Sequence, residues 1–245
     1  MEEISLKAQE IFNIGHFGVT NSLFSTIIVS LALIFFVVIA SKKIKIIPGV
    51  AQGAVEMASE WLLGLMESIL GGAKKAEQYF PLVATIFIFI MACNLSGILP
   101  GVGSLVIERG GHELPLLRSP AADLNFTLAF AIVSVMVTNI IGMIAVGAFA
   151  HISKFINFSN PIKFFIGILE LVSEFAKIIS LSFRLFGNIF AGEVLLIIIF
   201  FLAPYVIPLP FLFLEIFVGL IQAFVFAMLT LVSISLHTAL HDAEH

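Results

Sequence analysis

No proline interrupts the chain between Pro161 and Pro204, and most of the 42 residues between them are apolar. A single helix of this length would measure about 63 Å at about 1.5 Å per residue, whereas the hydrocarbon core of a bilayer is only about 30 Å thick. Such a helix must tilt steeply, bend, or project into water. A second over-long segment, from Phe211 to about His241, follows after a short connection. The pair predicts a tilted antiparallel hairpin of two long helices.

The composition places the chain in a membrane. Hydrophobic residues make up 60% of it and charged residues only 11%, with a mean hydropathy of +1.14. Soluble domains are closer to half apolar and one quarter charged. The net charge of -4 gives no reason to expect a nucleic-acid partner, and the single cysteine, Cys93, excludes an internal disulfide. We therefore expect one integral membrane domain over residues 1–245, without a cofactor.

Further membrane-spanning helices are predicted wherever about 20 mostly apolar residues follow one another. The candidates are Leu23–Ala40, Phe80–Leu99 and Leu124–Ala150, with a loop over residues 100–123 between the last two. Asn160 directly before Pro161 is typical of a helix start. With the two over-long segments, the sequence predicts an all-α membrane protein of about five crossings.

Residues 51–70 form a different kind of segment. Glu56, Glu60 and Glu67 share one face of the predicted helix. The opposite face carries Val55, Leu62, Leu65 and Ile69. This is an amphipathic helix that does not cross the membrane. Two positions are open to it: the membrane interface, or a site packed against the bundle.

Lysine and arginine in the loops predict the orientation, because cytoplasmic loops carry the excess of these residues. Counting crossings, one side receives Lys42, Lys43, Lys45, Lys74, Lys75, Lys154 and Lys163. The other side receives Lys7, Arg109 and Arg118. The N-terminus is therefore expected outside and the C-terminus in the cytoplasm.

Arg184 and Glu193 lie inside an apolar run, where a charged residue costs about 2.5 to 3.5 kcal/mol at a helix centre. They are nine positions apart, which is about 900° of helical rotation. Within one straight helix they lie on opposite faces, so they cannot neutralise each other. Each must have its own surroundings.

The Arg184 face is a polar stripe on an otherwise apolar helix. The residues that share it by helical steps are Glu170, Ser173, Lys177, Ser180, Gly187, Asn188 and Ala191. Such a stripe suits the wall of a water-filled cavity or a polar contact surface. Gly187 and Ala191 form a small-xxx-small pair, which allows either close internal packing or the approach of a partner helix.

The last segment has a polar face of its own, formed by Glu215, Gly219, Gln222 and Ser233. Antiparallel pairing of the two long helices places Glu193 and Glu215 at similar depth, with Gln222 deeper and near Arg184. Two carboxylates at one depth suit a proton relay. For Gln222 a plain hydrogen bond between the helices is the alternative.

Several of these residues belong to longer motifs. Residues 181–193, LSFRLFGNIFAGE, resemble the signature of subunit a of F-type ATP synthase, and residues 220–226, LIQAFVF, resemble its second motif. The resemblance extends to residues 80–100 and 119–125, and it covers most of the chain from about residue 80 onward. The two motifs together are highly specific.

The resemblance implies a function. Subunit a of that family is the non-catalytic, proton-translocating stator beside a rotor ring of hairpin c subunits, each with a membrane carboxylate. Two tilted helices face the ring, and an interfacial helix follows the first span. Besides the c-ring and membrane lipid, peripheral-stalk b subunits and the rest of the synthase are implied partners. The implied location is a bacterial-type cell membrane.

The family's functional positions can be assigned residue by residue. Its essential arginine matches Arg184, and Gly187 and Ala191 would contact the ring. The other matches are Asp123, Glu170, Lys177, Asn188, Glu193 and Gln222. This chain departs from the pattern with Glu215, where some relatives carry histidine, and with Gly97, where some carry aspartate. Protons are then expected to pass from outside through Asp123, Asn125, Glu215 and Glu193, and to leave along Glu170, Lys177 and Ser180.

Two other classes of protein remain open. A proton- or ion-coupled secondary transporter would also carry intramembrane charges, but it usually has internal repeats. A structural membrane subunit without a conduction role is disfavoured by the buried charges. The i, i+4 spacing of His237, His241 and His245 could bind a metal, although we expect these side chains to be solvated and no metal to be held.

Overall fold

The computed structural model describes residues 8–14, 17–42, 44–99, 102, 105–109, 112–155 and 160–239. The helices are α1 (Asn21–Ser41), α2 (Val50–Leu70), α3 (Ala73–Ser96), α4 (Leu124–Val146), α5 (Ala148–Ser153), α6 (Pro161–Leu202) and α7 (Pro208–Ala239). By length and composition, α1, α3, α4, α6 and α7 can cross a membrane, which makes five spans among the described residues. The prediction of an all-α membrane protein with about five crossings is confirmed.

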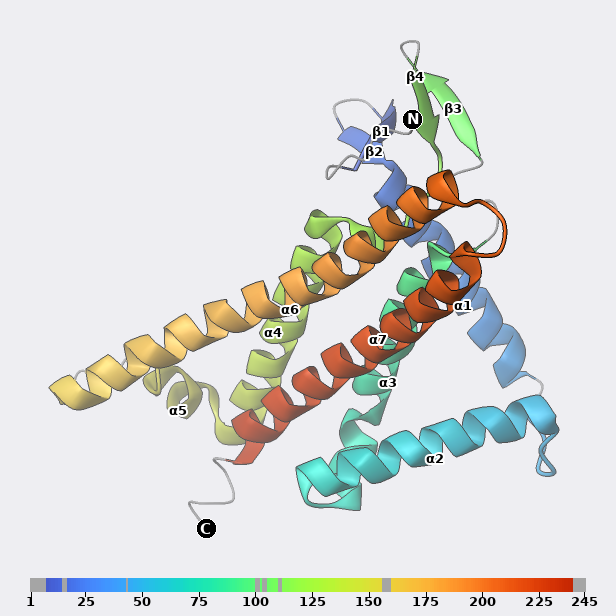
Figure 1. Cartoon of the computed structure of the whole chain (residues 1–245). Coiled ribbons are helices and arrows are strands. Elements are labelled where there is room, and N and C mark those ends of the chain that lie inside the picture. Colours follow the sequence, from blue (N-terminus) through green and yellow to red (C-terminus); the bar gives the residue numbers. More distant parts are fainter. Residues whose placement is uncertain are drawn as a thin grey trace.

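The two longest helices form the predicted antiparallel hairpin. α6 continues for 42 residues and α7 for 32. Figure 1 shows them side by side and inclined to α3 and α4. Asn160 caps α6 as expected, because its side chain accepts a hydrogen bond from the backbone N–H of Ile162 at 3.1 Å. Continuous tilted helices, rather than a sharp break, therefore accommodate the excess length.

Two helix boundaries differ from the prediction. α3 begins at Ala73 instead of Phe80, so Pro81 lies in the interior of the helix and not in its first turn. α4 ends at Val146, because Gly147 adopts a φ of 97°, a conformation that favours glycine and breaks the helix. The short α5 follows this break. An apolar run alone does not reveal such a stop.

Two β-hairpins lie outside the predicted elements. β1 (Glu10–Ile14) pairs with β2 (Phe17–Thr20), and β3 (Val106–Arg109) pairs with β4 (His112–Pro115), both antiparallel. A single turn of 3-10 helix, η1 (Pro120–Ala122), precedes α4. Figure 1 shows both hairpins at one end of the helix bundle, while α2 and the end of α7 lie at the opposite end. Strands of four or five residues are too short to give a reliable pattern.

Of the two positions that the sequence left open for the amphipathic helix α2, packing on the bundle is present for part of the helix. Its second half packs on the bundle, where Leu62, Met66 and Leu70 are buried and the ring of Trp61 lies 5.6 Å from that of Phe224. Its first half projects outward with Val55 exposed. In Figure 1 it crosses below the other helices, nearly perpendicular to α3.

One apolar core joins α2, α3, α4, α6 and α7. Its fully buried members include Met66, Ile90, Leu185 and Phe226. Helix α1 lies at the side of the bundle (Figure 1), and its apolar side chains, Phe35 among them, are largely exposed. In a bilayer this surface faces lipid, where exposed apolar side chains are favourable.

Candidate functional site

The polar stripe of α6 lies on an open surface. Arg184, Gly187, Asn188 and Ala191 are all exposed. A Cβ placed on Gly187 would meet no atom within 4 Å. The Arg184 guanidinium donates a hydrogen bond from Nη2 to Ser180 Oγ at 3.1 Å. This part of α6 therefore presents a cation and small side chains that the described part of the chain leaves uncovered.

Gln222 of α7 is buried at 4% exposure and faces α6. Its Oε1 accepts a hydrogen bond from Asn188 Nδ2 at 2.7 Å. The interhelical hydrogen bond, which the sequence allowed as an alternative for Gln222, is therefore present. Asn188 lies one helical turn beyond Arg184, so this contact fixes α7 directly behind the arginine.

Glu193 lies on the other side of α6 and meets a second arginine. Arg118 reaches Glu193 Oε2 with Nη2 at 3.3 Å and with Nε at 3.4 Å. Arg118 is only 8% exposed, and its guanidinium lies 5.8 Å from the centre of the Phe190 ring. By its position in the sequence, Arg118 was predicted only as a loop cation. A contact across 75 residues leaves no signal in sequence spacing.

Glu215 of α7 lies beside Glu193. Its carboxyl carbon is 3.3 Å from the point where a Cβ on Gly192 would stand, so glycine is what allows this close approach. The residue is 8% exposed, and its Oε2 has no hydrogen-bond partner among the described residues. The two carboxylates thus lie at one level of the hairpin, as antiparallel pairing predicts.

Asp123 stands at the start of α4, where its carboxylate makes two hydrogen bonds within the chain. Its Oδ1 accepts a hydrogen bond from the backbone N–H of Asn125 at 2.9 Å and so caps the helix. Its Oδ2 accepts a hydrogen bond from the Ser22 hydroxyl of α1. Asp123 is buried and Asn125 is exposed. The start of α4 is directed toward the end of the bundle that carries the β-hairpins (Figure 1).

At the opposite end, the predicted Glu170 and Lys177 each have an ionic partner. Lys154 Nζ lies 3.2 Å from Glu170 Oε1, and Lys177 Nζ lies 2.6 Å from Glu174 Oε1. Glu174 is buried at 7% exposure and is not among the residues predicted from the sequence. Its i, i+3 spacing to Lys177 was the available signal.

Glu174 is the centre of a polar cluster that joins four helices. His237 Nε2 of α7 lies 3.4 Å from its Oε1, and Asn139 Nδ2 of α4 donates to its Oε2 at 3.1 Å. Asn139 Oδ1 in turn contacts His151 Nε2 of α5 at 3.0 Å. Burial, and then the charges of Lys154 and His237, hold the pKa of His151 below its usual 6.5.

The same cluster contains the one group of possible metal ligands in the described part of the chain. One ligand atom each from Glu170, Glu174 and His237 lie within 4.8 Å of one another. Both carboxylates already pair with lysines, so a metal ion would have to displace two ammonium groups. His241 and His245, the other members of the histidine spacing, lie outside the described residues.

Comparison with known proteins gives the family. The family model described as ATP synthase A chain matches residues 23–235, which include Arg118, Glu174, Arg184, Glu193, Glu215 and Gln222. The chain belongs to this family. As a member it is a multi-pass membrane subunit of the Fo part of ATP synthase, and it is not a catalytic subunit.

Relatives from three bacteria support the assignment. A protein of Moorella thermoacetica named ATP synthase subunit a is 35% identical over 226 residues, covering 92% of this chain and 94% of that protein. One of Helicobacter pylori strain P12 is 34% identical, with 91% and 93% covered. One of Campylobacter jejuni strain 81-176 is 33% identical, with 89% of each covered. The similarity therefore extends over nearly the whole ATP synthase A chain.

Proposed function

We propose that the chain, as one integral membrane unit, is the stator beside a rotor ring and couples proton flow to the rotation of that ring. The observation that carries this proposal is the division of charges on α6. Arg184 lies on an exposed face with Gly187 and Ala191, whereas Glu193 and Glu215 lie on the inner side of the hairpin. Two half-channels that never meet directly require such a division.

The exposed Arg184 face suits a moving helical partner. Small residues at Gly187 and Ala191 let another helix approach closely, and the space at Gly187 is open. The partner is a ring of c subunits that each carry a membrane carboxylate. A cation that would be costly against lipid is then compensated by this carboxylate as each ring subunit passes.

Arginine is suited to this position because it keeps its proton in proteins, whereas lysine can lose it. A fixed cation stabilises the ionised form of a nearby carboxylate, so a ring carboxylate that arrives at Arg184 releases its proton. Before it returns to lipid it must be neutral, because a charge there is costly. It therefore takes up a proton from the other half-channel. The cation also repels protons and prevents leakage between the two paths.

The outer half-channel runs from the start of α4 to the inner side of the hairpin. Its residues are Asp123, Asn125, Glu215 and Glu193. Their positions support the path, because Asp123 and Asn125 stand at the start of α4 and the two carboxylates lie side by side on α6 and α7. Arg118, in contact with Glu193, is an additional member that holds this carboxylate in place.

The inner half-channel begins on the same stripe as Arg184. Protons leave along Ser180, Lys177 and Glu170 toward the end of the bundle where α2 lies. We place this end in the cytoplasm of a bacterial-type cell and the N-terminus outside, in accord with the lysine distribution. The membrane potential then supplies about 2.3 kcal/mol per charge for each 100 mV.

Purification of the tagged chain from its own membrane tests this function. We expect it to carry a ring of small two-helix proteolipids, b subunits of the peripheral stalk and a catalytic ATPase head. The membrane should then show ATP synthesis when a proton gradient is imposed. A chain that purifies alone and transports a solute would be a secondary transporter. A complex that synthesises ATP at the same rate without this chain would make it a structural subunit.

A further inference from the structure

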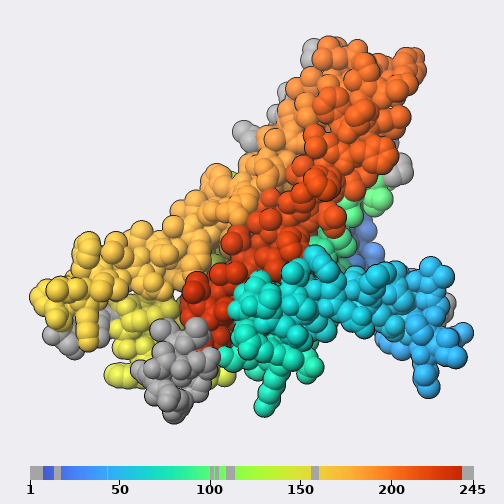
Figure 2. Space-filling model, turned by 60° about the horizontal axis from the view of Figure 1, so that its bottom comes forward, coloured from blue at the N-terminus to red at the C-terminus, as the bar shows by residue number. Residues whose placement is uncertain are grey.

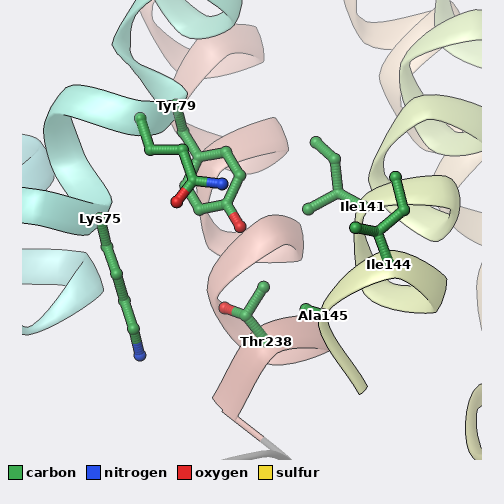
Figure 3. A pocket seen from close by; sticks show the side chains of 7 residues that line it. Lys75, Tyr79, Ile141, Ile144, Ala145 and Thr238 are labelled. Carbon is green, nitrogen blue, oxygen red and sulfur yellow. The ribbon is translucent and has the colours of Figure 1, made fainter. Parts of the chain in front are cut away.

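A pocket of about 370 Å³ opens between the ends of three helices, and none of its lining residues belongs to either proposed half-channel. α3 contributes Lys75, Gln78 and Tyr79, and α7 contributes Thr238. The wall from α4 consists of Ile141, Ile144 and Ala145. Figure 3 shows the Tyr79 hydroxyl directed toward the space between α7 and α4, with Lys75 extending in the direction in which α7 ends.

The pocket has a polar side and an apolar side. Lys75, Tyr79, Gln78 and Thr238 supply an ammonium group, hydroxyls and an amide, all of which can donate hydrogen bonds. The α4 side offers only hydrocarbon, and Ile144 is 79% exposed. A ligand that fits both sides needs an acceptor-rich anionic group at one end and an apolar body at the other.

The position in the membrane decides which ligand this is. The α4 wall belongs to the last turns of a candidate span that ends at Val146, and Lys75 lies in the first turn of the span that begins at Ala73. The pocket therefore lies where the hydrocarbon core meets the headgroup layer. Basic pockets between spanning helices at a cytoplasmic surface suit anionic lipid headgroups.

We propose that this pocket binds an anionic glycerophospholipid of the leaflet on the α2 side. Its phosphate contacts the Lys75 ammonium and the Tyr79 hydroxyl, and one acyl chain lies along Ile141 and Ile144. Bound lipid at this position bridges the start of α3 and the ends of α4 and α7. The pocket shares no lining residue with the proposed proton path, so its occupancy can be tested independently of ATP synthesis.

Photolabelling of the complete purified complex tests the proposal. The complex is placed in phosphatidylcholine nanodiscs with a small fraction of phosphatidylglycerol that carries a diazirine in its acyl chain. Labelled peptides are then identified by mass spectrometry. We expect label on the α4 segment 141–145. Loss of a charge-assisted contact in Lys75→Gln should reduce it about tenfold, and Tyr79→Phe should reduce it by a smaller factor.

Adjacent Lys74 provides the matched control, because it is exposed and does not line the pocket. Lys74→Gln should leave the labelling unchanged. Equal losses in both lysine variants would mean diffuse attraction to the surface and would overturn the proposal. Equal labelling by a phosphatidylcholine probe would do the same. Displacement of the label by inorganic phosphate would show that a free anion, not a lipid, is the ligand.

Discussion

At the scale of single residues, two arginines with opposite surroundings organise the charges. Arg184 is exposed and contacts Ser180, whereas Arg118 is buried and contacts Glu193. Glu215 lies at the same level but has a buried oxygen without a hydrogen-bond partner among the described residues. The two carboxylates are thus not equivalent, although both belong to the proposed outer path.

The carboxylate pair gives the first prediction. Glu193→Gln combined with Glu215→Gln should slow passive proton flux through the reconstituted complex at least about tenfold, since positioned proton-transfer groups contribute about 10²-fold or more. Flux is measured with a pH dye inside vesicles under an imposed potential. Glu60→Gln on α2, exposed and far from the path, is the control. Unchanged flux in the double variant would remove both carboxylates from the path.

His151 gives a pH prediction outside the spans. Its pKa in the folded chain is lowered, first by burial and then by Lys154 and His237, whereas the unfolded chain keeps a pKa of about 6.5. Below pH 6.5 the unfolded state binds a proton that the folded state resists, so stability falls as pH decreases. Lowering the pH from 8 to 5 should therefore lower the Tm more in the native chain than in His151→Gln. The Tm is measured by thermal unfolding at each pH. Parallel Tm curves would contradict this reading.

The residues that share a face of α6 or α7 were predictable from the sequence, because helical periodicity fixes them. Arg118 and Glu174 were not. The contact of Arg118 with Glu193 depends on how the segment before α4 folds back over α6. Glu174 depends on which neighbouring helices cover its face. Arg118 has no local pattern that points to Glu193, and the i, i+3 spacing of Glu174 to Lys177 does not show that the carboxylate is buried.

At the scale of elements, the α6–α7 hairpin is held by polar contacts at two levels. Asn188 and Gln222 join the helices near Arg184. Glu174 and His237 join them further toward the start of α6 and the end of α7. The long helices themselves were predictable from uninterrupted apolar runs. The break at Gly147 and the two short β-hairpins were not, because a single φ angle and strands of four or five residues decide them.

The Asn188–Gln222 contact can be measured by a double-mutant cycle. Asn188→Ala and Gln222→Ala should show a coupling free energy of unfolding of about 0.6 to 1.7 kcal/mol, the range for hydrogen bonds between membrane helices. Unfolding by denaturing detergent supplies the free energies. The distant pair Asn188→Ala with Thr26→Ala should be additive within about 0.5 kcal/mol. Additivity in both pairs would mean that the contact contributes nothing to the hairpin.

At the scale of the whole molecule, the chain has one well-packed side and one open side. The core fills the space between α2, α3, α4 and the inner faces of the hairpin. Figure 2 shows α6 and α7 side by side along one surface, with α2 extending to the side. The open face of α6 combines a cation, small residues and no covering element among the described residues, which suits a partner that must slide past.

A substitution at Gly187 distinguishes a face of α6 that contacts the ring from one that is merely exposed to lipid. Gly187→Leu should leave the thermal stability of the isolated chain intact, because a Cβ there meets nothing within 4 Å. In the complex the added side chain should collide with the ring and abolish ATP synthesis. Gly64→Leu, equally open but on α2, should leave synthesis unchanged. Full synthesis by Gly187→Leu would show that no ring helix packs on this face.

The central claim is that Arg184 couples proton flow to rotation, and ATP synthesis by the reconstituted complex tests it most directly. The driving force is a proton gradient alone, with sodium equal on both sides of the vesicle membrane. Arg184→Ala should abolish synthesis, whereas Lys163→Ala, which removes a cation from the first turn of the same helix, should leave it unchanged. Retained synthesis in Arg184→Ala would contradict the account.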